Sequence, residues 1–213
     1  MALFDEQVQQ QLKGILDQLG NDVNIIYFTQ EFECQSCRDG RMFVEEISAL
    51  NDKLKLQKYN LVTDADKADL YKVDKVPAIV LADKDGKDTG MRFYGVPGGY
   101  EINSFLAALM EVSGKKEQMP PDLEKRIKNI DKKIHIQVFV TLGCPYCPDA
   151  VSTAHRLALE NSNVVADMVE ASQFPHMAIK YNVTGVPKVV INEEHEFTGA
   201  QPITAFLDMI EQI

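Results

Sequence analysis

The four cysteines of this chain form two Cys-x-x-Cys pairs, Cys34 with Cys37 and Cys144 with Cys147. Thiols three positions apart lie almost one helical turn apart on one helix face, so each pair is close enough to make and break a disulfide. In "VFVTLGCPYC" the first cysteine stands where a strand-like run gives way to a helix-like one. Unpaired backbone N–H groups and the helix dipole stabilise a thiolate there. We therefore predict that Cys144 attacks and Cys147 resolves.

The two pairs belong to two copies of one sequence pattern. A proline follows the first cysteine by 43 positions in each copy, Pro77 after Cys34 and Pro187 after Cys144. A displacement of 110 residues also aligns the segments around these prolines, "YKVDKVPAIV" and "YNVTGVPKVV". Internal repetition of this extent indicates a duplicated domain.

Each copy has the same predicted order of helices and strands. The seam lies in "SGKKEQMPPD", which predicts an N-terminal unit, residues 1–116, and a C-terminal unit, residues 117–213. In each unit a helix precedes a strand rich in β-forming residues, and the cysteine pair opens the next helix. A second strand and helix then lead to Val-Pro, a hairpin and a closing helix. The predicted first strands are 23–29 and 134–141. This alternation favours an α/β sheet covered by helices on both faces.

Composition restricts the class of protein. With 213 residues, of which 45% are apolar, the chain can bury two small cores. A net charge of −10 disfavours nucleic acid and anionic membranes as partners. The N-terminus is unlike a signal peptide, and no run approaches the roughly 20 apolar residues of a membrane span. We expect a cytoplasmic protein, where paired cysteines more often serve redox or metal chemistry than structural disulfides.

The Val-Pro dipeptides are the second feature that points to disulfide chemistry. Proline cannot donate a sheet hydrogen bond, so Pro77 and Pro187 must begin or flank their strands. An X-Pro bond adopts the cis form at low cost. If the Val186–Pro187 bond is cis, its loop can present backbone groups beside Cys144 to an extended peptide. Pro145 suits the first helical position and stiffens the turn between the cysteines.

A Cys-x-x-Cys pair at a strand-to-helix junction, followed by Val-Pro, a hairpin and a closing helix, resembles the thioredoxin superfamily. "CPYC" is the active-site motif of glutaredoxins, and two such units resemble the glutaredoxin-like protein disulfide oxidoreductases of prokaryotes. The resemblance implies a tandem thioredoxin fold, in which each unit has a central mixed β-sheet with helices on both faces. It also implies disulfide exchange with protein substrates, no bound cofactor, and reduction by a thioredoxin-reductase-type flavoenzyme.

The resemblance also assigns roles to individual residues. It places Cys34, Cys37, Cys144 and Cys147 at the redox positions. Apart from the resemblance, we predict that the Val-Pro loops and the residue between the second pair of cysteines bind the substrate, through Val76, Pro77, Val186, Pro187 and Tyr146. Pro77 and Pro187 take the cis-proline positions. Tyr146 either contacts the substrate or covers Cys147. Paired thioredoxin folds also form the N-terminal domain of the flavoprotein that reduces alkyl-hydroperoxide peroxidases, so a peroxiredoxin is an alternative partner.

Charge distinguishes the two predicted sites. Glu31 and Glu33 precede Cys34, and their negative charge opposes thiolate formation, partly offset by Arg38. Near Cys144 the charged residue is Asp149. We therefore predict that Cys144 is the more acidic thiol and that the C-terminal unit carries most of the activity. The Cys34–Cys37 pair either passes electrons to or from the Cys144–Cys147 pair, acts independently in isomerisation, or is structural.

Two alternatives from other classes remain. Four cysteines in two pairs are able to bind zinc as a tetrathiolate, although the pairs belong to separate repeats. A peptide-binding protein with vestigial disulfides would also expose surface near the Val-Pro loops. The four histidines are not spaced as metal ligands, and we predict surface roles for His135, His155, His176 and His195. The prediction therefore contains no metal site.

Overall fold

The computed structural model describes residues 3–213, and the packing of its main chain divides them into two compact units. The first unit comprises the chain up to Asp88 together with Phe93–Val96 and Leu109–Lys116. The second comprises Thr89–Arg92, Pro97–Ala108 and Glu117–Ile213. The division of the sequence repeat between residues 116 and 117 stays a prediction.

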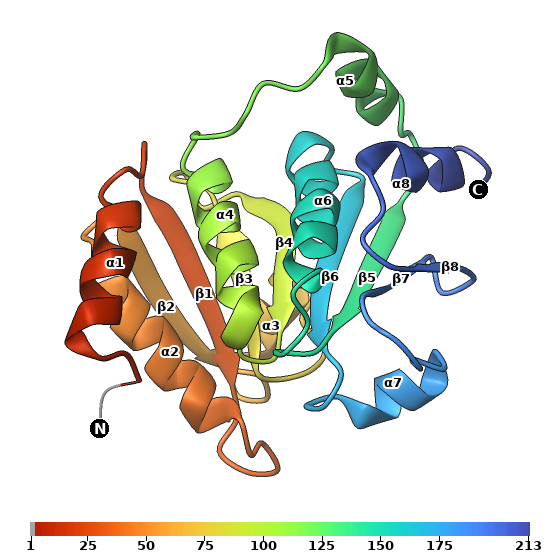
Figure 1. The fold of residues 1–213 in the computed structure, drawn as a ribbon. Coiled ribbons are helices and arrows are strands. Elements are labelled where there is room, and N and C mark those ends of the chain that lie inside the picture. Colours follow the sequence, from red (N-terminus) through yellow and green to blue (C-terminus); the bar gives the residue numbers. More distant parts are fainter. Residues whose placement is uncertain (1–2) are drawn as a thin grey trace. The chain divides into compact units, whose positions relative to one another are not determined.

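The first unit is built on a mixed β-sheet (Figure 1). Strand β1 pairs in parallel with β2 and antiparallel with β3. Its sequence, "VNIIYFT", is rich in β-branched and aromatic residues, which favour a buried strand. The elements in chain order are α1 (Glu6–Leu16), β1 (Val23–Thr29), α2 (Cys37–Ala49), β2 (Leu54–Asn60), α3 (Ala65–Tyr71) and β3 (Ala78–Ala82). The first sequence repeat ends with β4 (Asp88–Tyr94), the 3-10 helix η1 (Gly99–Glu101) and α4 (Ile102–Val112), whose residues the packing divides between the two units.

The second unit repeats this plan. Strand β5 pairs in parallel with β6 and antiparallel with β7, which continues into the hairpin partner β8. The elements are α5 (Pro121–Lys128), β5 (Ile134–Val140), α6 (Cys147–Glu160), β6 (Val164–Glu170), α7 (Pro175–Lys180), β7 (Lys188–Ile191), β8 (His195–Thr198) and α8 (Ile203–Ile210). The predicted fold class is confirmed, because each unit is an α/β unit with a mixed sheet and helices on both faces.

The helix that follows each cysteine pair packs its apolar stripe onto the strands of its own unit (Figure 1). From α2, the side chains of Phe43, Val44 and Ile47 are buried above β1 and β2. From α6, Val151 and Leu157 are fully buried above β5 and β6. Burial of apolar surface therefore fixes the axis of each helix, and with it the place of the cysteines at its N-terminus.

Each Val-Pro loop lies at the sheet end where the strand before the cysteines also finishes. The residue after Pro77 is Ala78, which pairs with Phe28 near the end of β1. The residue after Pro187 is Lys188, which pairs with Phe139 near the end of β5. The prolines therefore flank their strands as predicted. Among residues 3–213, no helix combines the length and apolarity needed to cross a membrane.

Candidate functional site

Both Cys-x-x-Cys pairs are closed disulfides in the structure. The Cα atoms are 5.4 Å apart in the Cys34–Cys37 pair and 5.5 Å apart in the Cys144–Cys147 pair. The inner cysteine is the first residue of the following helix in each unit, α2 or α6. The sulfurs thus lie where helical N–H groups lack intrahelical acceptors and the helix dipole is positive.

The position of Pro145 was predicted wrongly. Helix α6 begins at Cys147, so Pro145 lies in the turn before the helix, and Pro148 is the proline of its first turn. Pro145 and Tyr146 form a turn with Tyr146 as the N-cap, and Pro148 takes the first-turn position, where the missing N–H of proline costs no helical hydrogen bond. Pro145 restricts that turn through its fixed φ angle.

In each pair the first cysteine is the more exposed. Cys34 is half-buried, whereas 4% of Cys37 is exposed. Cys144 is 7% exposed, and Cys147 is fully buried. This order suits an outer sulfur that meets another molecule and an inner sulfur that resolves. It also places the more accessible outer sulfur at Cys34, although charge favours Cys144 as the more acidic thiol.

The two Val-Pro loops have matching geometry. The Val76–Pro77 and Val186–Pro187 peptide bonds are both cis, which confirms the expectation for Pro187 and for its repeat partner. In both loops the proline is buried and the valine is half-buried. The proline carbonyl accepts a hydrogen bond from a glycine of the neighbouring hairpin, Gly95 in one unit and Gly199 in the other.

The surroundings of the outer cysteines differ. Glu33, directly before Cys34, has a φ of 58°, a left-handed conformation that non-glycine residues rarely adopt. Beside it the side chain of Phe32 is 80% exposed. In the second unit the exposed aromatic residue is Tyr146, at 67%, between the two cysteines. Such exposure leaves the Tyr146 ring available to a bound chain.

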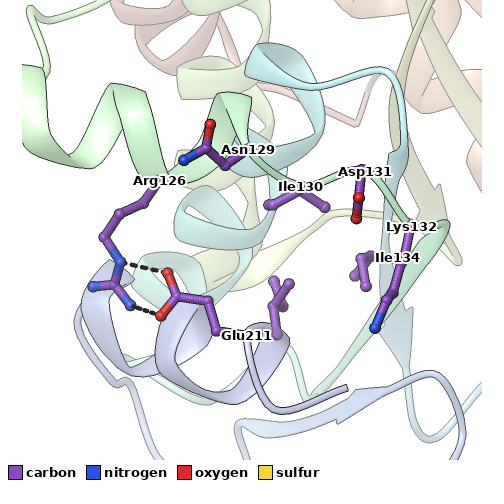
Figure 2. Close-up of a pocket in the computed structure, with 8 residues that line it drawn as sticks. Arg126, Asn129, Ile130, Asp131, Lys132, Ile134 and Glu211 are labelled. Atoms are coloured by element: carbon purple, nitrogen blue, oxygen red, sulfur yellow. Dashed lines mark hydrogen bonds and ion pairs between the residues drawn. The ribbon is translucent and has the colours of Figure 1, made fainter.

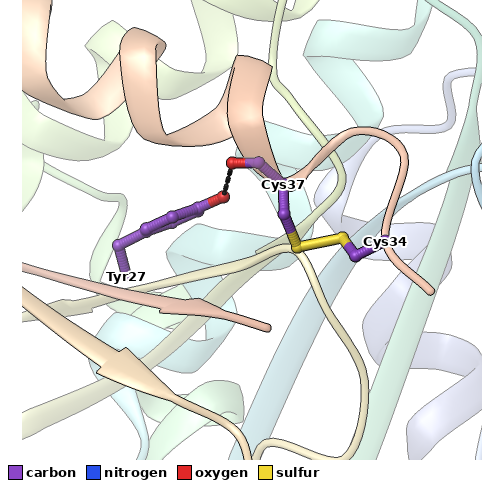
Figure 3. The surroundings of a disulfide bond; sticks show 3 residues. All are labelled: Tyr27, Cys34 and Cys37. Atoms are coloured by element: carbon purple, nitrogen blue, oxygen red, sulfur yellow. Dashed lines mark hydrogen bonds between the residues drawn. A yellow bond between two sulfur atoms is a disulfide. The ribbon is translucent and has the colours of Figure 1, made fainter. Parts of the chain in front are cut away.

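A buried tyrosine contacts the first disulfide (Figure 3). Tyr27 on β1 is fully buried, and its hydroxyl donates a 2.6 Å hydrogen bond to the backbone carbonyl of Cys37. Burial raises the pKa of this phenol to about 12, so it stays protonated and remains a donor. The sequence signal for this contact is Gly40, a glycine inside a helix, which the prediction did not interpret.

The backbone of η1 contacts the segment that leads to the second disulfide. The Tyr100 N–H donates to the Leu142 carbonyl at 3.0 Å, and Leu142 lies two residues before Cys144. A Cβ at Gly99 would be 2.3 Å from the same carbonyl oxygen, so only glycine permits this approach. The contact brings the next residue, Glu101, into the second unit, where η1 contacts α6.

Glu101 has the environment of a proton carrier. Its side chain is fully buried and accepts a hydrogen bond from the Ser104 hydroxyl. Burial raises the pKa of the carboxyl to about 7, against a smaller lowering by Ser104. Its Oε1 has no hydrogen-bond partner within the described part of the chain. Sequence reasoning missed Glu101 because it belongs by repeat to the copy that lacks CPYC.

A buried lysine braces the second Val-Pro loop. The Lys188 ammonium group donates to the carbonyl of Tyr181 at 2.6 Å and pairs with Glu196 at 2.9 Å. Because Lys188 directly follows Pro187, these contacts tie the loop to the end of α7. The equivalent residue of the first unit is Ala78, so the two loops are braced differently.

The prediction that all four histidines lie at the surface is wrong for His155. This residue is 1% exposed on the inner face of α6, and its Nε2 is 3.2 Å from the Arg92 carbonyl. Burial lowers the pKa of the imidazole to about 4. This position lies on the buried face of α6. A neutral imidazole fills the space there and also makes a hydrogen bond.

A pocket between α5 and α8 does not resemble a ligand site (Figure 2). One of its two cationic residues, Arg126, already forms ion pairs with Asp208 and Glu211 at 2.6 and 2.7 Å. Within residues 3–213, no cluster of three or more His, Cys, Asp or Glu side chains is arranged to hold a metal. The sulfurs of each cysteine pair are bonded to one another.

Mixed sheets, disulfides at helix N-termini and paired Val-Pro loops define two units of the thioredoxin fold, each with a closed Cys-x-x-Cys pair. A family model described as a thioredoxin domain matches residues 134–212. The structure of an Enterococcus faecalis alkylhydroperoxide reductase, AhpF, is 32% identical with a TM-score of 0.91, over 97% of this chain and 99% of that one. An Aeropyrum pernix protein disulfide oxidoreductase is 28% identical with a TM-score of 0.90, over 99% of this chain and 94% of that one.

Among curated sequences, an alkyl hydroperoxide reductase of Staphylococcus aureus is 25% identical over 98% of this chain and 38% of that protein. The chain thus spans less than two fifths of the length of the curated relatives it matches. It belongs to the family of two-unit, thioredoxin-fold chains that includes the matched part of Enterococcus faecalis AhpF.

Proposed function

We propose that this protein exchanges disulfides with protein clients, mainly through the Cys144–Cys147 pair and with the Cys34–Cys37 pair as a second centre. The observation that carries the proposal is the shared geometry of the two pairs, each a disulfide at a helix N-terminus with the inner sulfur more buried than the outer. Cysteine itself carries the two electrons, so this chemistry needs no bound cofactor. We propose a cytoplasmic location, where reducing equivalents keep such pairs cycling.

The reducing cycle begins with the pair as a dithiol. The Cys144 thiolate attacks one sulfur of a client disulfide, which forms a mixed disulfide and releases the first client thiolate. The Cys147 thiolate then attacks the Cys144 sulfur. The Cys144–Cys147 bond forms, the mixed disulfide breaks, and the second client thiolate leaves. Two electrons pass to the client, and the protein ends in the disulfide form of this structure.

Resolution requires the buried Cys147 thiol to lose its proton. We assign Glu101 as the acceptor, because it is buried in the same unit, on a 3-10 helix that contacts the helix headed by Cys147. A carboxyl with a pKa of about 7 is part ionised at neutral pH and able to take up a proton. The carboxylate of Asp149 is exposed, which makes it a poorer acceptor for a buried thiol.

Client binding is assigned to the Val-Pro loops. Val186 and Pro187 in the second unit, and Val76 and Pro77 in the first, would offer main-chain groups to an extended client segment beside the cysteines. The exposed ring of Tyr146 would pack on the same segment. A side chain that is 67% exposed is better placed to contact a client than to cover the fully buried Cys147.

A peroxiredoxin is the second candidate client. Its support is the similarity to the alkylhydroperoxide reductase AhpF over 97% of this chain. In this version the oxidised peroxiredoxin takes the place of the client disulfide, and a thioredoxin-reductase-type flavoenzyme restores the dithiol. Both versions use the same sulfur chemistry and differ in the surface that docks beside Tyr146.

Insulin reduction with dithiothreitol tests the proposal. We expect Cys144→Ser combined with Cys34→Ser to reduce the protein-dependent rate by about a thousandfold, because serine is not a nucleophile at neutral pH without a base. Cys144→Ser alone should lose most of the rate and keep the share contributed by the Cys34–Cys37 pair. The matched variant Cys34→Ser should keep most of the rate. A Cys144→Ser protein with wild-type activity would contradict the proposal, and a wild-type protein without activity would favour a non-catalytic binding protein.

A further inference from the structure

The first disulfide has a structural element that the repeat does not duplicate, the contact of Tyr27 with Cys37. The Tyr27 phenol extends from β1 beneath the first turn of α2, and its hydroxyl donates to the carbonyl of Cys37 (Figure 3). Cys37 is the inner cysteine and the first helical residue. The N-cap of this helix, Ser36, makes no side-chain capping hydrogen bond. The tyrosine therefore provides a side-chain anchor for the backbone of the inner cysteine.

Gly40 provides the space for this anchor. A Cβ on Gly40 would lie 2.6 Å from the Tyr27 hydroxyl and 3.2 Å from its ring carbons. Glycine inside a helix costs about 1 kcal/mol relative to alanine, so its presence in α2 calls for a reason. The close approach of the phenol is that reason. Tyr27 and Gly40 thus form one device, the Tyr27–Gly40 brace.

The second unit has other residues at both positions. A displacement of 110 residues places Gln137 where the first unit has Tyr27 and Ala150 where it has Gly40. Alanine is the best helix former, so Ala150 avoids the cost of a glycine inside α6. Gln137 is buried on β5. The Tyr27–Gly40 brace consequently distinguishes two sites that otherwise share their backbone plan.

We propose that Tyr27 is a positioning residue for the resolving step at the first site, an inference that rests on the disulfide exchange proposed above. When the Cys34–Cys37 bond opens, the Cys37 sulfur loses its covalent partner, and its reach to Cys34 depends on the backbone of the first helical turn. The hydroxyl of Tyr27 holds that backbone. The donated hydrogen bond also draws negative charge from a carbonyl close to the Cys37 sulfur, which favours its thiolate.

The balanced step is the release of a client held on Cys34. The Cys37 thiolate attacks the Cys34 sulfur, the Cys34–Cys37 bond forms, and the bond from Cys34 to the client breaks. The client leaves as a thiolate, and the proton lost by Cys37 passes to solvent. Tyr27 takes no part in bond making, so its loss should slow this step while sparing the earlier attack by Cys34.

Ellman's reagent separates the two steps. A full-length chain carrying Cys144→Ser and Cys147→Ser is reduced with dithiothreitol, freed of it, and mixed with the reagent in a stopped-flow instrument. Attack by Cys34 releases the first aryl thiolate, and resolution by Cys37 releases the second. We expect Tyr27→Phe to slow the second release about three- to tenfold, the range given by one lost hydrogen bond. The first release should change by less than about twofold.

Two further variants make the result specific. Gly40→Ala should slow the second release in the same way by displacing the hydroxyl, and its effect should not add to that of Tyr27→Phe. Tyr27→Phe in a chain with Cys34→Ser and Cys37→Ser should leave both releases from the second site unchanged. Thermal melts show whether each variant is folded.

The outcomes that overturn the inference are distinct from those that overturn the proposed function. If Tyr27→Phe and Gly40→Ala both fold and show a normal second release, or slow both releases equally, the Tyr27–Gly40 brace serves packing and does not position Cys37. The absence of any second release from the parent chain would instead contradict disulfide exchange at this site.

Discussion

The two disulfide sites share one backbone plan and differ in the side chains that support it. In the first unit the inner cysteine is held by a tyrosine hydroxyl whose pKa lies at about 12, far above neutral. In the second unit the carboxyl of Glu101 and the imidazole of His155 are buried, with pKa values of about 7 and 4. The two repeats therefore share the backbone geometry of a disulfide-exchange site, but they differ in the titratable side chains buried in each unit.

Exposure favours Cys34 as the more reactive outer cysteine, whereas charge favours Cys144. Cys34 is half-buried behind an exposed Phe32, whereas Cys144 is 7% exposed. The acidic residues Glu31 and Glu33 oppose a thiolate at Cys34, and no comparable pair flanks Cys144 in sequence. The first site is thus the easier to reach, whereas the charge argument still predicts that Cys144 of the second site is the more acidic thiol. This contrast suits two centres with different partners.

The largest effect expected from this comparison concerns acid stability and His155. Above pH 6.5 the imidazole is neutral in the folded and unfolded states. As the pH falls from 6.5 to 4, the unfolded chain binds a proton that the folded chain does not, so the free energy of unfolding decreases. A lowering of the imidazole pKa from 6.5 to about 4 corresponds to a decrease of up to about 3 kcal/mol in the free energy of unfolding. Urea titrations of wild type and His155→Gln at pH 7 and pH 4 measure this.

The wild-type protein should lose up to about 3 kcal/mol more than His155→Gln over that interval. His176→Gln is the matched control, because His176 is exposed, and its acid dependence should follow the wild type. Equal losses in wild type and His155→Gln would show that His155 is protonated in the folded protein. The contrast between the buried groups of the two units would then weaken.

A smaller effect is expected from Glu101→Gln on the resolving step of the second site. In a chain with Cys34→Ser and Cys37→Ser, the second release from Ellman's reagent should slow about tenfold at pH 7.5, below the usual range for a positioned proton acceptor. The wild-type rate should rise through pH 7 as Glu101 ionises, and this inflection should vanish in the variant.

Glu194→Gln, which alters an exposed carboxylate of the same unit, serves as the control and should keep the inflection. A Glu101→Gln protein that keeps both the rate and the inflection would remove Glu101 from the proposed mechanism. The proposed difference in proton chemistry between the two sites would then lose its support.

The repeat and its chemistry could be read from the sequence because both depend on local patterns. The strand "VNIIYFT" occupies the predicted residues 23–29, and the fifth strand ends one residue before its predicted limit. Spacing alone placed Cys34, Cys144 and the two Val-Pro loops at matching points of the two copies. Hydrophobic periodicity and residue type carry this information without any knowledge of tertiary contacts.

The supporting groups could not be read in this way because tertiary packing decides their burial. Glutamate is usually exposed, but Glu101 is buried because Gly99 lets η1 approach Leu142. His155 is a polar residue within the apolar stripe of α6, and the sequence does not show that this position is buried. Gly40 was visible as a glycine within a helix, yet its partner Tyr27 comes from another element. The turn around Pro145 differed from the prediction because a second proline, Pro148, occupies the first turn of α6.

Trapping of mixed disulfides tests the central claim most directly. Cys147→Ser and Cys37→Ser proteins, each reduced and mixed with a disulfide-bonded client such as insulin, cannot resolve the adduct that the outer cysteine forms. We predict a client chain bound to Cys144 in the first variant, identified by mass spectrometry after alkylation, and a slower-forming adduct at Cys34 in the second. A Cys147→Ser protein whose Cys144 stays free would contradict the account.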